Sequence, residues 1–128
     1  MLDINQVYSF NFPTAIRFGA GVIKELGSYL KDNNLSSPLL VTDPNVAELK
    51  FFKEIQKDLE QLGLNSEVYK EMHKNPIKSD VLHGGDMYDK TKRDCIIGIG
   101  GGVSLDVARA IVLRVNHKRD LFDYDDLI

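Results

Sequence analysis

The chain has 128 residues, enough for one compact domain and too few for two ordinary ones. Hydrophobic residues make up 43% and charged residues 27%, close to the average for soluble globular proteins, which excludes disordered, collagen-like and coiled-coil chains. A net charge of −3 gives no electrostatic reason to expect nucleic acid or an anionic membrane as a partner, and no apolar run approaches the ~20 residues of a membrane span.

Cellular location follows from two further features. The N-terminus has neither a basic region nor a long apolar core, so we expect no secretory signal. The single cysteine, Cys95, cannot form an internal disulfide, which fits a reducing cytoplasm. We therefore expect a cytoplasmic protein with no nucleic acid and no membrane as partner.

The first elements lie before residue 35. Tyr8 to Phe18 mixes aromatic and β-branched residues, which predicts one or two short strands, and Gly19 to Gly21 predicts a turn. A helix that closes at residues 32–34 follows, because apolar side chains recur at helical spacing at Val22, Leu26, Tyr29 and Leu30.

A continuous apolar run at residues 38–42 then predicts a strand buried on both faces of a parallel sheet. One long helix is expected from about Ala47 to Leu62, with Gly63 as its stop. Its apolar stripe consists of Leu49, Phe52, Ile55, Leu59 and Leu62.

The second half continues the alternation. Residues 64–69 form a short predicted strand, and Asn75-Pro76 marks a loop. Ser79 or Asp80 is expected to cap a helix that reaches about Tyr88 and is weakened by two internal glycines.

An apolar strand at residues 95–99 precedes a helix over roughly Ser104 to Val115. The tail, residues 120–128, has no clear period. The order strand, helix, strand, helix, strand, helix predicts a parallel sheet with helices on its faces.

The most informative motif is Gly100-Gly101-Gly102-Val103, where the last strand turns into the last helix. Glycines let the backbone adopt positive φ and approach a ligand, and the helix start offers unpaired N–H groups. This combination predicts a phosphate or pyrophosphate site, since a tight turn alone needs fewer glycines. It is neither a P-loop nor the usual dinucleotide fingerprint, which follows the first strand.

Three polar residues accompany this loop, each with a structural alternative. Asp43 ends a buried strand and could accept hydrogen bonds from a ribose diol, but Asp before Pro44 is also a helix N-cap. Asp106, early in the last helix, either complements the helix dipole or contacts a ligand. Asn75 before proline is more often a turn residue than a binding residue.

Metal and nucleophile chemistry find no support in the pattern. His73, His83 and His117 are scattered, with no Cys or His at metal-ligand spacing from another. His83 and Asp86 share a predicted helical face, but two ligands do not make a site. Cys95 opens a buried strand and is expected to be an inert core thiol.

The motifs taken together resemble a known family. In order they are residues 12–14 (Phe-Pro-Thr), residues 17–21 (Arg-Phe-Gly-Ala-Gly), residues 40–43 (Leu-Val-Thr-Asp), residues 74–76 (Lys-Asn-Pro), and residues 94–109 with Gly-Gly-Gly and Asp-x-Ala-Arg. This series is similar to the N-terminal domain of the iron-containing (group III) alcohol dehydrogenases, over about residues 10–124.

The resemblance implies an α/β fold with a Rossmann-like parallel sheet, flanking helices and an N-terminal β segment, as in the N-terminal domain of dehydroquinate synthase. It implies that residues 1–128 are an NAD(P)-binding domain, with Gly100 to Val103 at the pyrophosphate, Asp43 at the adenosine ribose, Asn75 lining the cleft and Asp106 nearby. NAD is favoured over NADP, because an anionic Asp43 repels a 2′-phosphate.

The same resemblance implies a following helical domain, absent from this chain, whose Asp and three His hold Fe²⁺ or Zn²⁺. The metal polarises an alcohol or aldehyde oxygen, and hydride passes between the substrate and the nicotinamide. The 128 residues alone are therefore expected to be inactive, and a homo-oligomer is left open.

Two positions depart from the family pattern. Val103 replaces the usual serine and leans toward dehydroquinate synthase, whereas Arg109 replaces a lysine and keeps its charge. Two alternatives to an oxidoreductase domain stay open: a stand-alone truncated binding module, and the N-terminal domain of a dehydroquinate synthase-like lyase.

Overall fold

The computed structural model describes residue 17 and residues 19–117. The strands predicted up to Phe18 and the tail at residues 120–128 lie outside the described residues, except for Arg17, which belongs to no helix or strand. The elements in chain order are η1 (Val22–Glu25), α1 (Leu26–Asp32), β1 (Pro38–Val41), α2 (Pro44–Ala47), α3 (Lys50–Gln61), β2 (Glu67–Tyr69), α4 (Lys78–Lys90), β3 (Cys95–Gly98) and α5 (Gly102–His117).

The three strands form a parallel sheet in the order β2-β1-β3, which confirms the predicted architecture. Leu40, at the middle of β1, pairs with Val68 on one side and Ile97 on the other. The apolar β1 sequence suits this central position, because both faces and both edges of the strand are covered.

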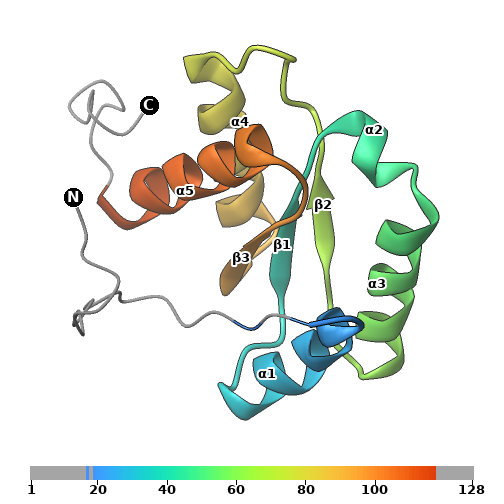
Figure 1. Cartoon of the computed structure of the whole chain (residues 1–128). Coiled ribbons are helices and arrows are strands. Elements are labelled where there is room, and N and C mark those ends of the chain that lie inside the picture. The colour runs from blue at the N-terminus through green and yellow to red at the C-terminus, as the bar shows by residue number, and fades with distance from the viewer. Residues whose placement is uncertain (1–16, 18, 118–128) are drawn as a thin grey trace, which may run out of the picture.

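Helices cover the sheet on both faces, giving three layers (Figure 1). Alternate residues of a strand point to opposite faces, so Leu39 and Val41 pack with α4 and α5, whereas Leu40 packs with α1 and α3. The core is thus divided in two by the sheet, and each half buries the apolar stripe of two helices.

The chain reverses direction across the sheet at β1. From β1 it passes through α2 and α3 to β2, and then returns through α4 to β3 on the far side of β1. The carboxyl ends of β1 and β3 therefore flank a topological switch point, the place where open α/β sheets bind ligands. Figure 1 shows α2 and the start of α5 at this end of the sheet.

The helix predicted from about Ala47 to Leu62 forms as α3, but it begins only at Lys50, and a separate short helix, α2, precedes it. Helix α2 ends in a tight turn in which Leu49 N donates to Val46 O, and Leu49 itself is extended, with ψ of 149°. The periodicity could not reveal the break, since the apolar spacing continues across it. Phe52, Ile55 and Leu59 are buried as expected, but Leu49 and Leu62, the ends of the predicted stripe, are exposed.

Other boundaries differ slightly. Strand β2 begins at Glu67, three residues later than predicted, and Tyr29 of α1 points outward with 61% of its surface exposed. Gly84, inside α4, has a packing role: a Cβ there would lie 2.4 Å from Ile111 Cδ1 of α5. The glycine that lowers helix propensity lets the two helices approach closely.

Candidate functional site

The glycine loop lies at the carboxyl edge of the sheet, between β3 and α5. Ile99 N donates to Val41 O at 2.9 Å, so the pairing with β1 extends one residue beyond β3. Helix α5 begins at Gly102 and is 16 residues long. The loop thus connects a strand to the N-terminus of a long helix, as the sequence predicts, and the strand order places this N-terminus at the switch point.

The three glycines differ in what the fold demands of them. Gly100 has φ of +134°, and a Cβ there would lie 2.9 Å from Ser104 Oγ, so the turn itself needs glycine. Gly101 and Gly102 lie outside the positive-φ region, and a Cβ on either would meet nothing within 4 Å. The fold does not require these two glycines, and the backbone beside them is open to a ligand.

The residue after the glycines sits at the surface. Val103, in the first turn of α5, is exposed, whereas the next residue, Ser104, is buried. The N–H groups at the start of a long helix carry a partial positive charge and have no partner within the helix. An anion at this point would meet backbone donors and an apolar Val103 side chain, without the hydroxyl that serine would supply.

Asp43 caps the short helix α2. Its Oδ1 accepts a hydrogen bond of 2.8 Å from Val46 N, and Pro44 occupies the first helical turn. The capping role considered for Asp43 is therefore confirmed, and its contact with a ribose stays a prediction. The cap engages one carboxylate oxygen, so a cap and a ligand contact are compatible.

Helix α2 and the glycine loop lie together although they are distant in sequence. A Cβ on Gly100 would be 3.7 Å from Val46 Cγ2. Since Val46 donates to Asp43, the Asp43 cap and the glycine loop lie close together at the carboxyl ends of β1 and β3.

A buried hydroxyl lies one residue before Asp43. Thr42 is fully buried, and its backbone N donates to Tyr69 O at 3.1 Å. Its Oγ1 has no hydrogen-bond partner among the described residues. A buried hydroxyl without a partner lowers the stability of the folded state, so Thr42 destabilises the carboxyl end of the central strand.

Asp106 lies farther from the helix end than the sequence indicated. Because α5 begins at Gly102, Asp106 lies in the second turn, where the helix dipole contributes little. Its Oδ1 is 3.8 Å from Nη1 of Arg109, and both side chains are largely exposed. The structure thus favours a surface ion pair over a dipole partner, and the predicted ligand contact stays untested.

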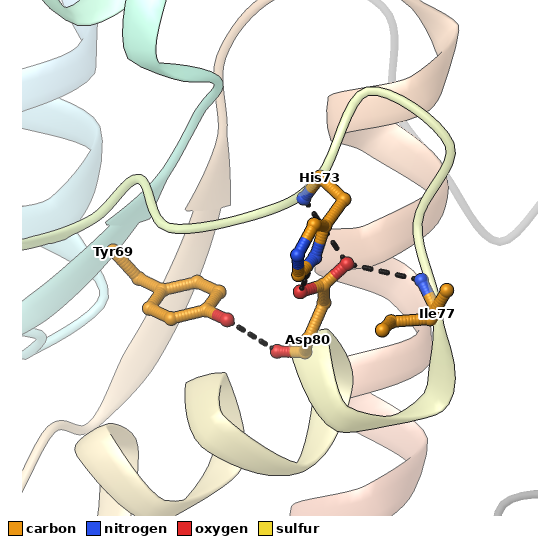
Figure 2. A network of polar contacts seen from close by, with 4 residues as sticks. All are labelled: Tyr69, His73, Ile77 and Asp80. Atoms are coloured by element: carbon orange, nitrogen blue, oxygen red, sulfur yellow. Dashed lines mark hydrogen bonds and ion pairs between the residues drawn. The ribbon is translucent and has the colours of Figure 1, made fainter.

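Asn75 lies in an exposed loop between β2 and α4, as predicted. The carboxylate of Asp80 holds both sides of this loop (Figure 2). Asp80 Oδ2 accepts from His73 N at 3.1 Å and from Ile77 N at 3.0 Å, and its Oδ1 lies 2.7 Å from His73 Nδ1. Tyr69, the last residue of β2, donates its hydroxyl to Asp80 O at 2.5 Å.

Opposing effects set the acidity of this network. Burial alone raises the pKa of Asp80, but hydrogen bonds from Ile77 and His73 outweigh it and hold that pKa below its ordinary value. Burial, reinforced by the charge of Asp80, raises the pKa of Tyr69 to about 12. Asp80 is therefore an anion and Tyr69 a neutral donor at neutral pH.

Sequence reasoning missed the role of Asp80. It predicted Ser79 or Asp80 as the N-cap of α4, which is wrong, because the N-cap is Ile77 and Asp80 lies three residues inside. Ile77 has no polar side chain to cap the helix, so only the return half of a capping box forms. The sequence signal for this role is the spacing of Asp80, an acidic residue three positions after Ile77, where the Asn-Pro loop ends.

The cysteine behaves as a core residue. Cys95 is half-buried and packs against the cluster that contains Leu40 and Ile55. Burial raises the pKa of its thiol to about 12, with a further contribution from the hydrogen bond to Asp94. The thiolate is scarce at neutral pH, in line with the inert thiol predicted from the sequence.

Comparison with known proteins identifies the family of this chain. Residues 13–127 match the family model described as iron-containing alcohol dehydrogenase. The chain belongs to this family. The match spans the glycine loop, Asp43 and the Asn75 loop.

The chain is also similar to two curated relatives in sequence and to a solved structure in fold. The chain is 31% identical to alcohol dehydrogenase 4 of Saccharomyces cerevisiae, over 95% of this chain and 32% of the relative. It is 30% identical to the NAD-dependent methanol dehydrogenase of Bacillus methanolicus, over 91% of this chain and 30% of the relative. The crystal structure of NADH-dependent butanol dehydrogenase A from Thermotoga maritima shares the fold, with a TM-score of 0.81, 24% identity, and coverage of 92% of this chain and 30% of that one.

The chain spans about a third of the length of these dehydrogenases. Among the residues that the structure describes, no three His, Cys, Asp or Glu side chains are placed to hold a metal ion. The same residues include no helix long and apolar enough to cross a membrane.

One surface pocket lies away from the glycine loop. It has a volume of about 340 Å³ and is lined by His83, Asp86, Met87, Lys90 and Thr91. These residues belong to the second half of α4 and the turn after it, which lead to the amino end of β3. The pocket therefore lies toward the opposite edge of the sheet from the candidate site.

Proposed function

We propose that this chain is the NAD(P)-binding part of a metal-dependent alcohol dehydrogenase, which transfers hydride between an alcohol or aldehyde and the nicotinamide. Within this family the named relatives include an NAD-dependent methanol dehydrogenase, which supports NAD as the cofactor. The parent protein then needs further sequence, because this chain spans about a third of its relatives.

The observation that carries the proposal is the openness of Gly101 and Gly102 at the start of α5. Neither glycine is needed for turn geometry or packing, yet both stand where a long helix meets the switch point of the sheet. A pyrophosphate there would receive backbone N–H donors without a side chain in the way. The residues present therefore fit the diphosphate of a dinucleotide.

The other predicted contacts follow from this placement. With the pyrophosphate at Gly100 to Val103, the Asp43 cap lies beside the loop, and its carboxylate would meet the adenosine ribose. Asn75, after the neighbouring strand β2, would line the cleft, and Asp106 would lie near its rim. An anionic Asp43 accepts hydrogen bonds from a 2′-hydroxyl and repels a 2′-phosphate, so we expect NAD to bind more tightly than NADP.

The metal has no place in the described residues of this chain. They bring together no ligand set for Fe²⁺ or Zn²⁺, so we assign the metal to the helical domain that the family implies and derive no step through it. The alcohol or aldehyde, the helical domain and any homo-oligomer are likewise assigned to the parent protein. The lone, half-buried Cys95 fits the cytoplasmic location that we propose.

Calorimetry of the purified chain with NAD tests the proposal. We expect binding in the high-micromolar range or weaker, because cofactor clefts commonly lie between domains and one wall is missing. Losing about 3 kcal/mol of contacts lowers affinity about a hundredfold. We also expect no alcohol-dependent NADH formation with any divalent metal.

A matched variant separates the site from nonspecific binding. Gly101→Val fills the open space above the helix start, so it should abolish the heat of binding while the circular dichroism spectrum stays unchanged. Equal binding by this variant, or no binding by the wild-type chain at about 5 mM NAD, would contradict the proposal.

A further inference from the structure

We propose that Asp80 is a positioning residue that holds the loop from His73 to Ile77, and through it Asn75, in the geometry that binds the cofactor. The inference rests on the proposed function, because the role of Asn75 in the cleft is part of it. It concerns a residue that neither touches the proposed ligand nor belongs to the glycine loop.

The contacts of one carboxylate carry the inference. Asp80 Oδ2 accepts from the backbone N of His73 and of Ile77, the two residues that bound the loop. Asp80 Oδ1 lies 2.7 Å from His73 Nδ1, which fixes the imidazole ring as well. Figure 2 shows the carboxylate between these two loop ends. A single side chain therefore closes the loop.

Asp80 is buried and is hydrogen-bonded to the sheet through Tyr69. Asp80 is 1% exposed and belongs to the first turn of α4, and its backbone O accepts from the buried Tyr69 hydroxyl. Tyr69 ends β2 and pairs with Val41 of the central strand. Asp80 thus connects both ends of the loop to the last residue of β2, while Asn75 itself is exposed.

The loop depends on this carboxylate. Loop segments lose conformational freedom only where hydrogen bonds or packing hold them, and Lys74, Asn75, Pro76 and Ile77 are all exposed. An apolar residue in place of Asp80 would leave two backbone N–H groups without their acceptor. The ends of the loop would then separate, and Asn75 would sample many positions.

A double-mutant cycle on the NAD affinity of the chain tests the proposal. We expect Asn75→Ala and Asp80→Ala each to weaken NAD binding about tenfold, and the double variant to bind no more weakly than either alone. Non-additivity is the signature of action through Asn75. Additive losses, or wild-type affinity in either single variant, would overturn the proposal.

Two conservative variants test whether a loss of affinity in Asp80→Ala comes from the missing carboxylate or from unfolding of the chain. Asp80→Asn keeps an oxygen for the backbone donors and an amide for His73 Nδ1, so it should restore most of the affinity lost in Asp80→Ala. Asp86→Asn, on the exposed face of the same helix, serves as the control and should bind as the wild type does. If Asp80→Ala does not fold, Asp80→Ser takes its place in the cycle.

Amide hydrogen exchange distinguishes failure of this inference from failure of the proposed function. Asp80→Ala should speed exchange at His73 and Ile77 about tenfold or more while leaving Leu59 in α3 unchanged. Absence of NAD binding by the wild type contradicts the proposed function, and the exchange rates then decide alone whether Asp80 holds the loop. Unchanged exchange at both amides would overturn the role of Asp80.

Discussion

Val46 of α2 lies against Gly100 of the glycine loop, close enough that a Cβ on Gly100 would be 3.7 Å from Val46 Cγ2. The same Val46 donates its backbone N–H to Asp43 Oδ1. Val46 therefore contacts both the N-cap of α2 and the turn that precedes α5. The cap of α2 and the glycine loop thus belong to one packed unit, within which Gly100 is constrained by its neighbours and Gly101 is not.

Alanine at Gly100 should mainly lower the stability of the chain, whereas alanine at Gly101 should mainly lower its affinity for NAD. Gly100→Ala should lower the free energy of unfolding by about 1–3 kcal/mol, because φ of +134° disfavours a Cβ and Ser104 Oγ would be 2.9 Å away. Gly101→Ala should change it by less than about 0.5 kcal/mol but weaken NAD binding. Urea unfolding and calorimetry measure the two effects, and a large stability loss in Gly101→Ala would contradict the assignment.

Thr42→Val should stabilise the chain by about 1 kcal/mol. The two side chains have nearly the same shape, and the substitution removes a buried hydroxyl without a partner among the described residues. Thr42→Ser, which keeps the hydroxyl and loses a methyl group, should be less stable than the wild type. Equilibrium urea unfolding decides, and a destabilised Thr42→Val would mean that the hydroxyl is hydrogen-bonded in solution.

Asp43 combines a cap and a charge, and two variants separate them. Asp43→Ala should cost about 1 kcal/mol of stability through the lost cap, whereas Asp43→Ser should retain it, because serine caps helices equally well. Asp43→Ser removes the negative charge, so the affinity for NADP relative to NAD should rise about fivefold or more. An unchanged ratio, measured by calorimetry with both cofactors, would count against the ribose role.

Acid should destabilise the chain through Asp80 and Asp94. Burial raises the pKa of each, but hydrogen bonds from Ile77 and His73, and from Ser36 and Ser37, bring each below its ordinary value. A lowered native pKa adds stability above the unfolded pKa of about 4, and this stability is lost as pH falls through the native values.

Urea unfolding at pH values from 6 down to 2.5 measures this loss. Asp94→Asn should be less stable than the wild type at pH 6, with the difference narrowing below about pH 4. If the free energies of unfolding of the two proteins differ by the same amount at every pH in this range, the loss of stability in acid does not come from Asp94.

The sequence alone determined the architecture and the location of the candidate site. The apolar runs at Pro38–Val41 and Cys95–Gly98 predict strands, and the helical spacing between them predicts crossovers; both strands form, with β1 fully buried and β3 half-buried. Because the carboxyl ends of parallel strands lie at one edge of a sheet, the sequence predicts that Asp43 and Gly100 to Gly102 share that edge. The pairing of β1 with β3, which the tertiary structure decides, makes them neighbours. The strands, the crossovers and the shared edge are consequences of local pattern and chain connectivity, which a sequence displays directly.

Only the tertiary structure decided which residues the fold itself requires. It separated Gly100, needed for the turn, from Gly101 and Gly102, and it moved the start of the predicted long helix to Lys50, after a separate short helix that the sequence did not predict. It also showed that Asp80 closes the Asn75 loop, a role invisible to periodicity because the partner at the N-cap is an isoleucine. Such roles depend on which atoms meet across the sheet and along a loop, and neither spacing nor composition encodes those distances.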